Sequence, residues 1–147
     1  MNESMNTMMD AIRIMLHRYK ELEKKVGERY GLSGGEMAVL AFLINNPGKD
    51  TASDVCYGRM MKKGNVSFLV TSLEMKGLMG KRIDEKDKRI IHLYLKEEAS
   101  AVSKELERMR NSFIDKVFSG FSIDEKEKLI DFFGAMKCNL EVLDGKR

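Results

Sequence analysis

The apolar residues of this chain follow a helical period almost from end to end, with one interruption. Steps of three and four between apolar positions indicate helices over about residues 4–30, 33–45, 52–60, 64–76, 97–118 and 122–140. From Leu78 the period changes, and residues 78–83 and 89–95 are expected to form two short strands joined by the charged segment 84–88. In the second strand, Ile91, Leu93 and Leu95 alternate with polar or aromatic residues. A single proline in 147 residues leaves little to break the helices. The sequence therefore predicts one mainly α domain over residues 1–147 with a small β-hairpin.

Capping residues mark where several of these helices begin and end. Gly31 follows the first helix, where a residue with left-handed backbone is expected. Ser33 and Glu36 have the spacing of a capping box, in which each side chain accepts a hydrogen bond from the other residue's backbone N–H. Residues 51–54 and 122–125 repeat the pattern. The helix at 64–76 instead begins near Lys62, which is a poor cap.

Composition excludes several classes of protein. No apolar stretch approaches the roughly 20 residues of a membrane span, and the first ten residues do not resemble a signal peptide. Two cysteines cannot form a disulfide framework, so a cytoplasmic location is expected. His17 and His92 have no Cys or acid at metal-ligand spacing, which argues against a zinc site. Because no phosphate-binding loop, nucleophile elbow or paired-carboxylate pocket is visible, we expect neither an enzyme nor a bound cofactor.

Positive charge is concentrated in the middle of the chain. Residues 59–89 hold nine Lys or Arg and four Asp or Glu, a net charge of +5, whereas the whole chain carries only +3. The remaining residues are therefore slightly acidic, at −2. A basic segment of this kind is typical of a nucleic-acid-binding element, although a chance excess of charge on a solvated surface gives the same count.

Three helices followed by a hairpin form a winged helix-turn-helix, and here the residues resemble a known family. Residues 65–78, NVSFLVTSLEMKGL, are similar to the recognition helix and its exit in the MarR family of bacterial transcription regulators. Residues 84–89, DEKDKR, with 90–99 after them resemble that family's wing and return strand. The resemblance covers nearly the whole chain. It implies a DNA-binding lobe over about 33–98, flanked by dimerisation helices over about 4–30 and 99–143.

The residue types of the recognition helix and wing fit contacts with double-stranded DNA. Asn65 can pair with adenine, Ser67 and Thr71 can hydrogen-bond bases, and Phe68 can touch a thymine methyl, unless it packs inside the protein. Lysines before the helix suit phosphates, and basic residues at a projecting wing tip suit the minor groove. The predicted DNA-binding residues are Lys62, Lys63, Gly64, Asn65, Ser67, Phe68, Thr71, Lys86, Lys88 and Arg89.

The chain departs from the family pattern on the recognition helix, in the wing, and at the N-cap of that helix, which is usually Ser or a similar residue and here falls near Lys62. Family members commonly carry Arg or Lys on the outward face of the recognition helix, where this sequence places Phe68 and Ser72. The wing position usually held by Arg is Lys86, which lacks the planar fork of a guanidinium. In the family, the Asp and Arg of the wing also brace the hairpin, so Asp87 and Arg89 are expected to be partly structural.

The two ends of the chain are rich in apolar residues, including Met5, Met8, Met9, Phe132, Phe133 and Leu140. The resemblance implies that these ends interlock in a homodimer that binds a pseudo-palindromic operator; an intramolecular bundle is the alternative. It also implies a cleft for small apolar or aromatic effectors that release a repressor from DNA. The residues expected there are Met15, Tyr19, Met37, Leu40 and Phe42, although all five also suit a core.

Two other functions stay open at this point. One is a winged-helix module that docks protein with little or no DNA binding, which the weakly basic helix and Phe68 favour. The other is an oxidation sensor at Cys56, because Arg59 one turn later would lower the pKa of its thiol. A buried, inert Cys56 is the simpler interpretation.

Overall fold

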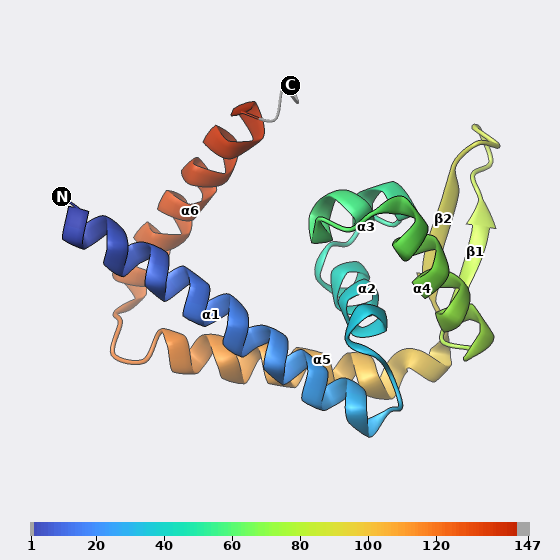
Figure 1. Cartoon of the computed structure of the whole chain (residues 1–147), viewed down its shortest axis with the longest axis horizontal. Coiled ribbons are helices and arrows are strands. Elements are labelled where there is room, and N and C mark those ends of the chain that lie inside the picture. Colours follow the sequence, from blue (N-terminus) through green and yellow to red (C-terminus); the bar gives the residue numbers. More distant parts are fainter. Residues whose placement is uncertain (1, 144–147) are drawn as a thin grey trace. The chain divides into compact units, whose positions relative to one another are not determined.

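The computed structural model describes residues 2–143 and has the predicted order of elements (Figure 1). Four helices precede a two-stranded hairpin, and two more helices follow it. The elements are α1 (Asn2–Arg29), α2 (Gly34–Asn45), α3 (Ala52–Arg59), α4 (Lys63–Met75), β1 (Met79–Ile83), β2 (Ile91–Leu95), the 3-10 turn η1 (Glu97–Ala99), α5 (Ser100–Val117) and α6 (Ile123–Leu143). The predicted fold class, mainly α with a β-hairpin wing, is confirmed.

The local signals that predicted the helix ends are confirmed. Ser33 and Glu36 form a capping box at α2, and Thr51 and Asp54 form one at α3. Before α6 the same exchange occurs, with Ser122 N–H donating to Glu125 over 2.8 Å and Glu125 N–H donating to the Ser122 hydroxyl over 3.2 Å. Gly31 has a left-handed φ of 64°. At α4 the N-cap is Lys62, whose side chain makes no capping hydrogen bond.

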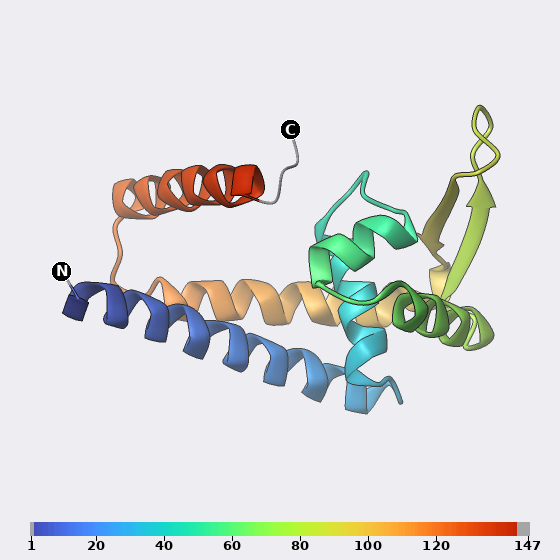
Figure 2. The ribbon, with the colours of Figure 1, turned by 45° about the horizontal axis from the view of Figure 1, so that its top comes forward.

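The contacts divide the chain into two compact units, Met1–Arg110 and Asn111–Arg147. In the first unit, α2 is the centre of the core, because α1, α3, α4 and β2 all pack against it (Figure 2). Met37, Val39 and Leu40 on α2 are completely buried. Because its neighbours cover α2 on nearly every side, Phe42 is buried as well.

The hairpin pairs antiparallel, with Met79 opposite Leu95 at its base and Ile83 opposite Ile91 at its far end. Figure 2 shows it extending away from the helices of the first unit. The alternation of apolar residues in the second strand predicts that Ile91 and Leu93 face inward alike. Leu93 is buried, but Ile91 is 45% exposed, because the hairpin has left the body at that point.

The second unit consists of the end of α5, a turn, and α6. Phe118 and Phe121 pack edge to face in the turn, with ring centroids 5.8 Å apart. Gly120 between them has a φ of 86°, which allows the chain to reverse. In its described residues α6 buries no side chain within the single chain.

Candidate nucleic-acid interface

All six predicted DNA-binding residues of α4 lie on its exposed side. Lys63, Gly64, Asn65, Ser67 and Thr71 are exposed, and Phe68 is 72% exposed. The opposite side of the helix packs into the core through Val66, Leu69, Val70 and Leu73. The alternative in which Phe68 packs inside the chain is therefore wrong. Instead, a large aromatic ring stands in solvent beside small polar side chains.

Ser72 does not lie on the outward face, and that prediction is corrected. Its hydroxyl donates to Oε1 of Glu36 over 2.6 Å, which turns it toward α2. Lys76 donates from Nζ to the other oxygen of Glu36 over 2.9 Å and to the Gly31 carbonyl over 2.9 Å. Glu36 is itself 3% exposed. The capping residue of α2 thus also fastens the C-terminal end of α4.

The charge of Glu36 is stabilised by these contacts. Burial acts to raise the pKa of its carboxyl group, but the hydrogen bonds from Ser72, Lys76 and Ser33 outweigh it and lower that pKa to about 2. Glu36 is therefore ionised at neutral pH, and the position of α4 on α2 depends on a buried carboxylate.

Within the basic segment 59–89, four lysines form no ion pair with the described residues: Lys62 and Lys63 at the start of α4, and Lys86 and Lys88 in the wing tip. Arg82 on β1 is exposed and has no ion pair with them either, whereas the other basic side chains of this segment are paired. Lys76 binds Glu36, and Lys81 binds Glu74 over 2.7 Å. The positive charge counted in the sequence therefore lies, in the fold, at one end of α4 and along the hairpin to the wing tip.

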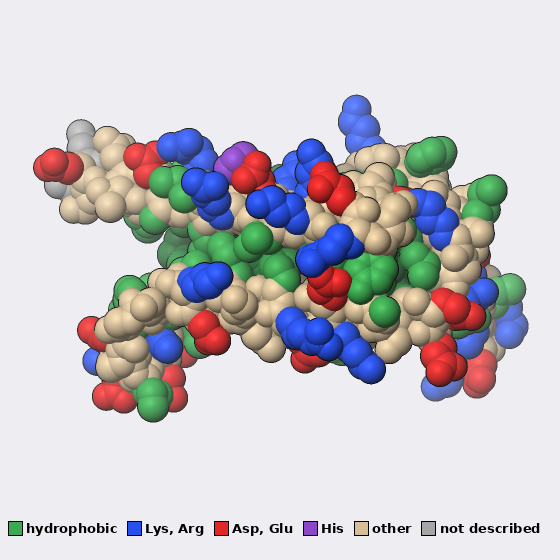
Figure 3. All heavy atoms as spheres, turned by 90° about the horizontal axis from the view of Figure 1, so that it is seen from below, with side chains coloured by type: hydrophobic (Ala, Val, Ile, Leu, Met, Phe, Trp, Pro, Cys, Tyr) green, Lys and Arg blue, Asp and Glu red, His purple; other side chains and the backbone are tan. Residues whose placement is uncertain are grey.

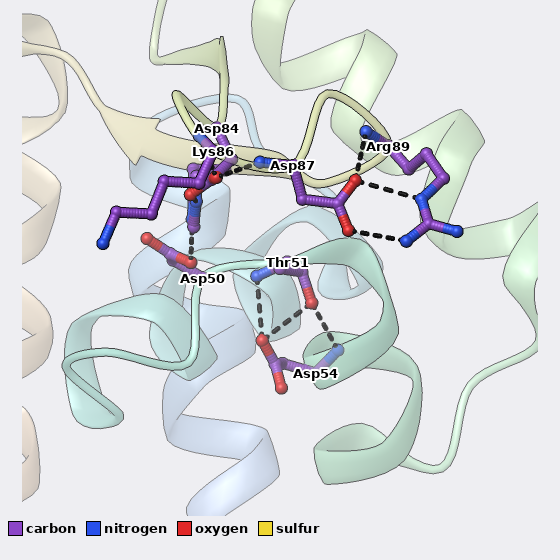
Figure 4. Close-up of polar contacts among 8 residues, drawn as sticks. Asp50, Thr51, Asp54, Asp84, Lys86, Asp87 and Arg89 are labelled. Atoms are coloured by element: carbon purple, nitrogen blue, oxygen red, sulfur yellow. Dashed lines mark hydrogen bonds and ion pairs between the residues drawn. The ribbon is translucent and has the colours of Figure 1, made fainter.

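The wing tip is braced by two aspartates, Asp84 and Asp87, of which the resemblance implied the second, together with Arg89. Oδ1 of Asp84 accepts from the backbone N–H groups of Lys86 and Asp87, at 2.8 and 2.7 Å. Asp87 faces Arg89, whose guanidinium donates two hydrogen bonds of 3.0 and 2.9 Å (Figure 4). Hydrogen bonds from the Arg89 side chain and backbone lower the pKa of Asp87. Arg89 is therefore bound within the wing, while Lys86 and Lys88 extend from it.

A histidine clamp, which we did not predict, joins the wing to the segment before α3. Nδ1 of His92 lies 2.7 Å from Oδ1 of Asp50, and Nε2 lies 3.0 Å from Oδ2 of Asp84. The backbone strengthens the junction, since Leu93 N–H donates to the Asp50 carbonyl over 2.6 Å. Asp50 lies 42 residues before His92. No spacing rule signals such a contact, because only the fold brings the two together.

The carboxylates on both sides change the ionisation of the clamp. Hydrogen bonds to Asp50 and then to Asp84 raise the pKa of His92. The pKa of Asp84 falls to about 2, chiefly through the Asp87 N–H and then through His92 and the Lys86 N–H. A doubly protonated His92 donates to both aspartates, so the clamp is strongest while the ring is charged.

The residues expected in an effector cleft lie in two different environments. Met37 and Leu40 are completely buried in the core and Phe42 is 5% exposed, whereas Met15 and Tyr19 are partly exposed on α1. Burial, and next the charge of Glu23, raise the pKa of the Tyr19 hydroxyl. Asn45, which accepts from the guanidinium of Arg110, is also hydrogen-bonded to Tyr19. An effector site stays a prediction, with Met15 and Tyr19 as its accessible members.

Arg59 is not free to act on Cys56. Its guanidinium donates to Oε1 of Glu23 over 3.1 Å, and this carboxylate, on α1, is nearly buried. The pair ties α3 to α1, so the basic neighbour on which the oxidation-sensor hypothesis depended is already occupied.

Neither a metal site nor a membrane span is found in residues 2–143. Their His, Cys, Asp and Glu side chains form no group of three able to hold a metal ion. No helix there combines the length and apolar character that crossing a membrane requires.

No protein-family model matches the chain, but a curated relative and many solved structures do. The chain is 24% identical over 131 residues to the uncharacterised HTH-type transcriptional regulator YkoM of Bacillus subtilis, covering 87% of this chain and 84% of that protein. A MarR-family regulator from Silicibacter pomeroyi superposes with a TM-score of 0.74 at 23% identity, over 87% of this chain and 86% of that one. The regulator PA3341 gives 0.76 at 20% identity, over 92% and 96%.

These likenesses confirm the predicted fold, which is that of the MarR-family regulators. All three proteins are transcription regulators and none is an enzyme. Two other structures of the same fold were solved in studies of binding. A mutant of S. aureus MepR, with a TM-score of 0.55, is bound to an oligodeoxyribonucleotide. The DNA binding of Bordetella bronchiseptica BpsR, with a TM-score of 0.63, is regulated by 6-hydroxynicotinic acid.

Proposed function

We propose that this protein is a cytoplasmic transcription regulator that binds double-stranded DNA sequence-specifically as a homodimer. One observation carries the proposal: unpaired lysines lie at the start of α4 and at the wing tip, on either side of a helix face that is exposed and hydrogen-bonding. A helix of this kind fits the major groove, and a basic wing fits the neighbouring minor groove. The MepR complex with DNA supports this use of the fold.

Each predicted residue has a distinct part in the proposed complex. Asn65, Ser67, Phe68 and Thr71 meet base edges, and Gly64 lets the helix approach the DNA closely. Lys62 and Lys63 bind phosphates, so they add affinity with no sequence preference. In the wing, Lys86 and Lys88 contact DNA, whereas Arg89 acts through Asp87 by fixing the shape of the tip.

A homodimer follows from the small size of one winged helix and from the exposed apolar surface. A single lobe makes few contacts, and two lobes gain by binding two half-sites of a pseudo-palindromic operator together. Large apolar side chains are exposed on the first half of α1, among them Met5 and Met9, and on α6, among them Phe132 and Leu140. Figure 3 shows hydrophobic side chains at the surface between charged ones on the face seen from below. A second copy of the chain would cover such surface.

The regulator is proposed to be a repressor that a small apolar or aromatic effector releases from DNA. The support is the effector response of BpsR, together with the partly exposed Met15 and Tyr19 of α1. A ligand there would lie beside the Glu23–Arg59 pair, which connects α1 to α3 directly before the recognition helix.

Two alanine variants test the assignment of the DNA-binding residues. We expect Asn65→Ala to lose preference at one base position, because a bidentate contact to adenine discriminates by roughly 1–3 kcal/mol. We expect Lys86→Ala to weaken binding to all sequences alike, because a tip lysine contributes charge and no base pattern. Binding to a panel of duplexes with single base changes measures both. If neither variant alters binding, the assignment of α4 and the wing is wrong.

A protein-docking module is the second candidate, and the exposed ring of Phe68 is the observation that favours it. Aromatic side chains are often anchors of protein interfaces. The two functions differ in their response to salt, because phosphate contacts release counterions and apolar docking does not.

A further inference from the structure

The outward face of α4 carries no charge beyond its first residue. After Lys63, its exposed positions are Gly64, Asn65, Ser67, Phe68, Thr71 and Met75. The one acid of the helix, Glu74, is half-buried and paired with Lys81. The commonest specific contact in the major groove is Arg or Lys on the O6 and N7 atoms of guanine. The centre of this face has no side chain that can make it.

Two neighbouring side chains on this face offer apolar groups instead. Phe68 and Thr71 are three residues apart on a helix, so they lie side by side on one face. The ring of Phe68 is 72% exposed. The hydroxyl of Thr71 donates to the Ser67 carbonyl over 3.0 Å, which uses its only proton and leaves the methyl group and oxygen lone pairs for a partner.

The apolar group that the floor of the major groove presents is the C5-methyl of thymine. We infer that Phe68 and Thr71 read thymine methyl groups, so that A·T pairs are selected under the middle of α4 by methyl contact. The inference rests on the proposed function and names the chemistry of its specificity. Asn65, three residues before Phe68, would complement it by pairing with adenine N6 and N7.

Charge favours DNA over a protein as the occupant of this face. The apolar pair lies roughly one and a half to two and a half turns along the helix from Lys62 and Lys63, and the first turn of α4 contains no acid. The four N-terminal N–H groups of the helix add partial positive charge at the same end, with no side-chain cap at Lys62. A polyanion that also presents methyl groups matches both features.

Replacing thymine by uracil tests the inference, because it removes the methyl group and keeps every hydrogen-bonding group of the base. The full chain is first used to recover a tight duplex from a random pool. Uracil then replaces each thymine of the half-site in turn, and fluorescence anisotropy measures each Kd. We expect about a fourfold weaker Kd at one or two positions, which is the effect of losing one buried methyl. Substitutions outside the half-site should have no effect.

Protein variants assign the effect to its residues. Phe68→Ala should bind the thymine duplex more weakly and bind thymine and uracil duplexes equally at the affected position. Lys86→Ala should weaken both duplexes and keep their ratio. The inference would be overturned if the unaltered chain bound the thymine and uracil duplexes equally, or if the recovered duplex had G·C pairs under α4. In either case, salt-dependent binding would still support a DNA regulator. A chain that binds no duplex at low salt would instead refute the proposed function, and the inference with it.

Discussion

At the scale of single residues, the site depends on carboxylates that hold other groups in place. Asp84 shapes the wing tip, Asp87 holds Arg89, and Glu36 fastens Ser72 and Lys76. The Asp and Arg of the wing were expected from the resemblance. The His92 clamp was not expected, because Asp50 lies 42 residues before His92 and Asp84 looks like an ordinary loop acid. Ser72 was misplaced because its position was carried over from the family pattern, and a hydroxyl suits solvent and a buried carboxylate alike.

The clamp predicts that the stability of the wing depends on pH. Its contacts with Asp50 and Asp84 raise the pKa of His92 above the ordinary 6.5. A raised pKa in the folded state adds stability that is full below pH 6.5 and is lost as the pH rises through the raised value. Asp84, whose pKa is lowered to about 2 from 3.8, adds stability above pH 3.8 that is lost as the pH falls through about 2.

Thermal unfolding of the chain and of His92→Gln at several pH values measures this effect. We expect the melting temperatures of the two proteins to differ most between pH 4 and 6.5, and the difference to shrink as the pH rises above that range. A difference that does not change between pH 6 and 9 would show that ionisation of His92 does not contribute to the stability of the wing.

At the scale of elements, local signals determined the helices, whereas packing decided what each face contacts. Capping boxes such as Ser33–Glu36 involve residues three apart, so the sequence predicts them reliably. Burial of α2 on nearly every side is set by four distant elements and leaves no local signal. For the same reason Met37 and Leu40, which suited an effector cleft by residue type, are completely buried in the core.

The junction of α2 and α3 depends on Gly58. A Cβ added there would lie 2.1 Å from a ring carbon of Phe42. Glycine to alanine within a helix ordinarily stabilises a protein by about 1 kcal/mol. At Gly58 we expect the opposite, a loss of roughly 1–3 kcal/mol in the free energy of unfolding, because the ring and helix must shift. Denaturant unfolding of Gly58→Ala measures it.

Gly34→Ala is the matched control, because a Cβ at Gly34 meets nothing within 4 Å and the residue also lies in a helix. It should be neutral or slightly stabilising. Equal effects of the two substitutions would contradict the close packing of α3 on the Phe42 ring.

At the scale of the whole molecule, the proposed DNA-binding function requires a second copy of the chain. The sequence pointed to this through the apolar residues at its two ends, and the structure leaves several of them exposed on α6, including Phe132 at 65% and Leu140 at 59%. These two residues are eight apart on one helix, so they share a face. The sequence of one chain carries no signal of how two copies pair, because the partner of each side chain lies on another molecule.

The proposed dimer is tested by placing charge on that face. We expect the chain to sediment at about twice its mass of 16.8 kDa and the Phe132→Asp, Leu140→Asp double variant to sediment as a monomer. Circular dichroism checks that the variant keeps its helices, and Glu127→Ala, an exposed polar change on α6, serves as the control. A monomeric parent chain, or a double variant that is still fully dimeric, contradicts the use of this face.

The salt dependence of binding to duplex DNA tests whether the protein is a DNA-binding regulator. The chain is titrated into labelled random duplexes, and then into the duplex recovered from them, at 50 and 200 mM salt. If Lys62, Lys63, Lys86 and Lys88 of two protomers contact phosphates, we expect affinity to fall by about 10³-fold or more over that range. Binding that changes little with salt, or no binding at 50 mM, would contradict a DNA-binding regulator and favour a protein-docking module.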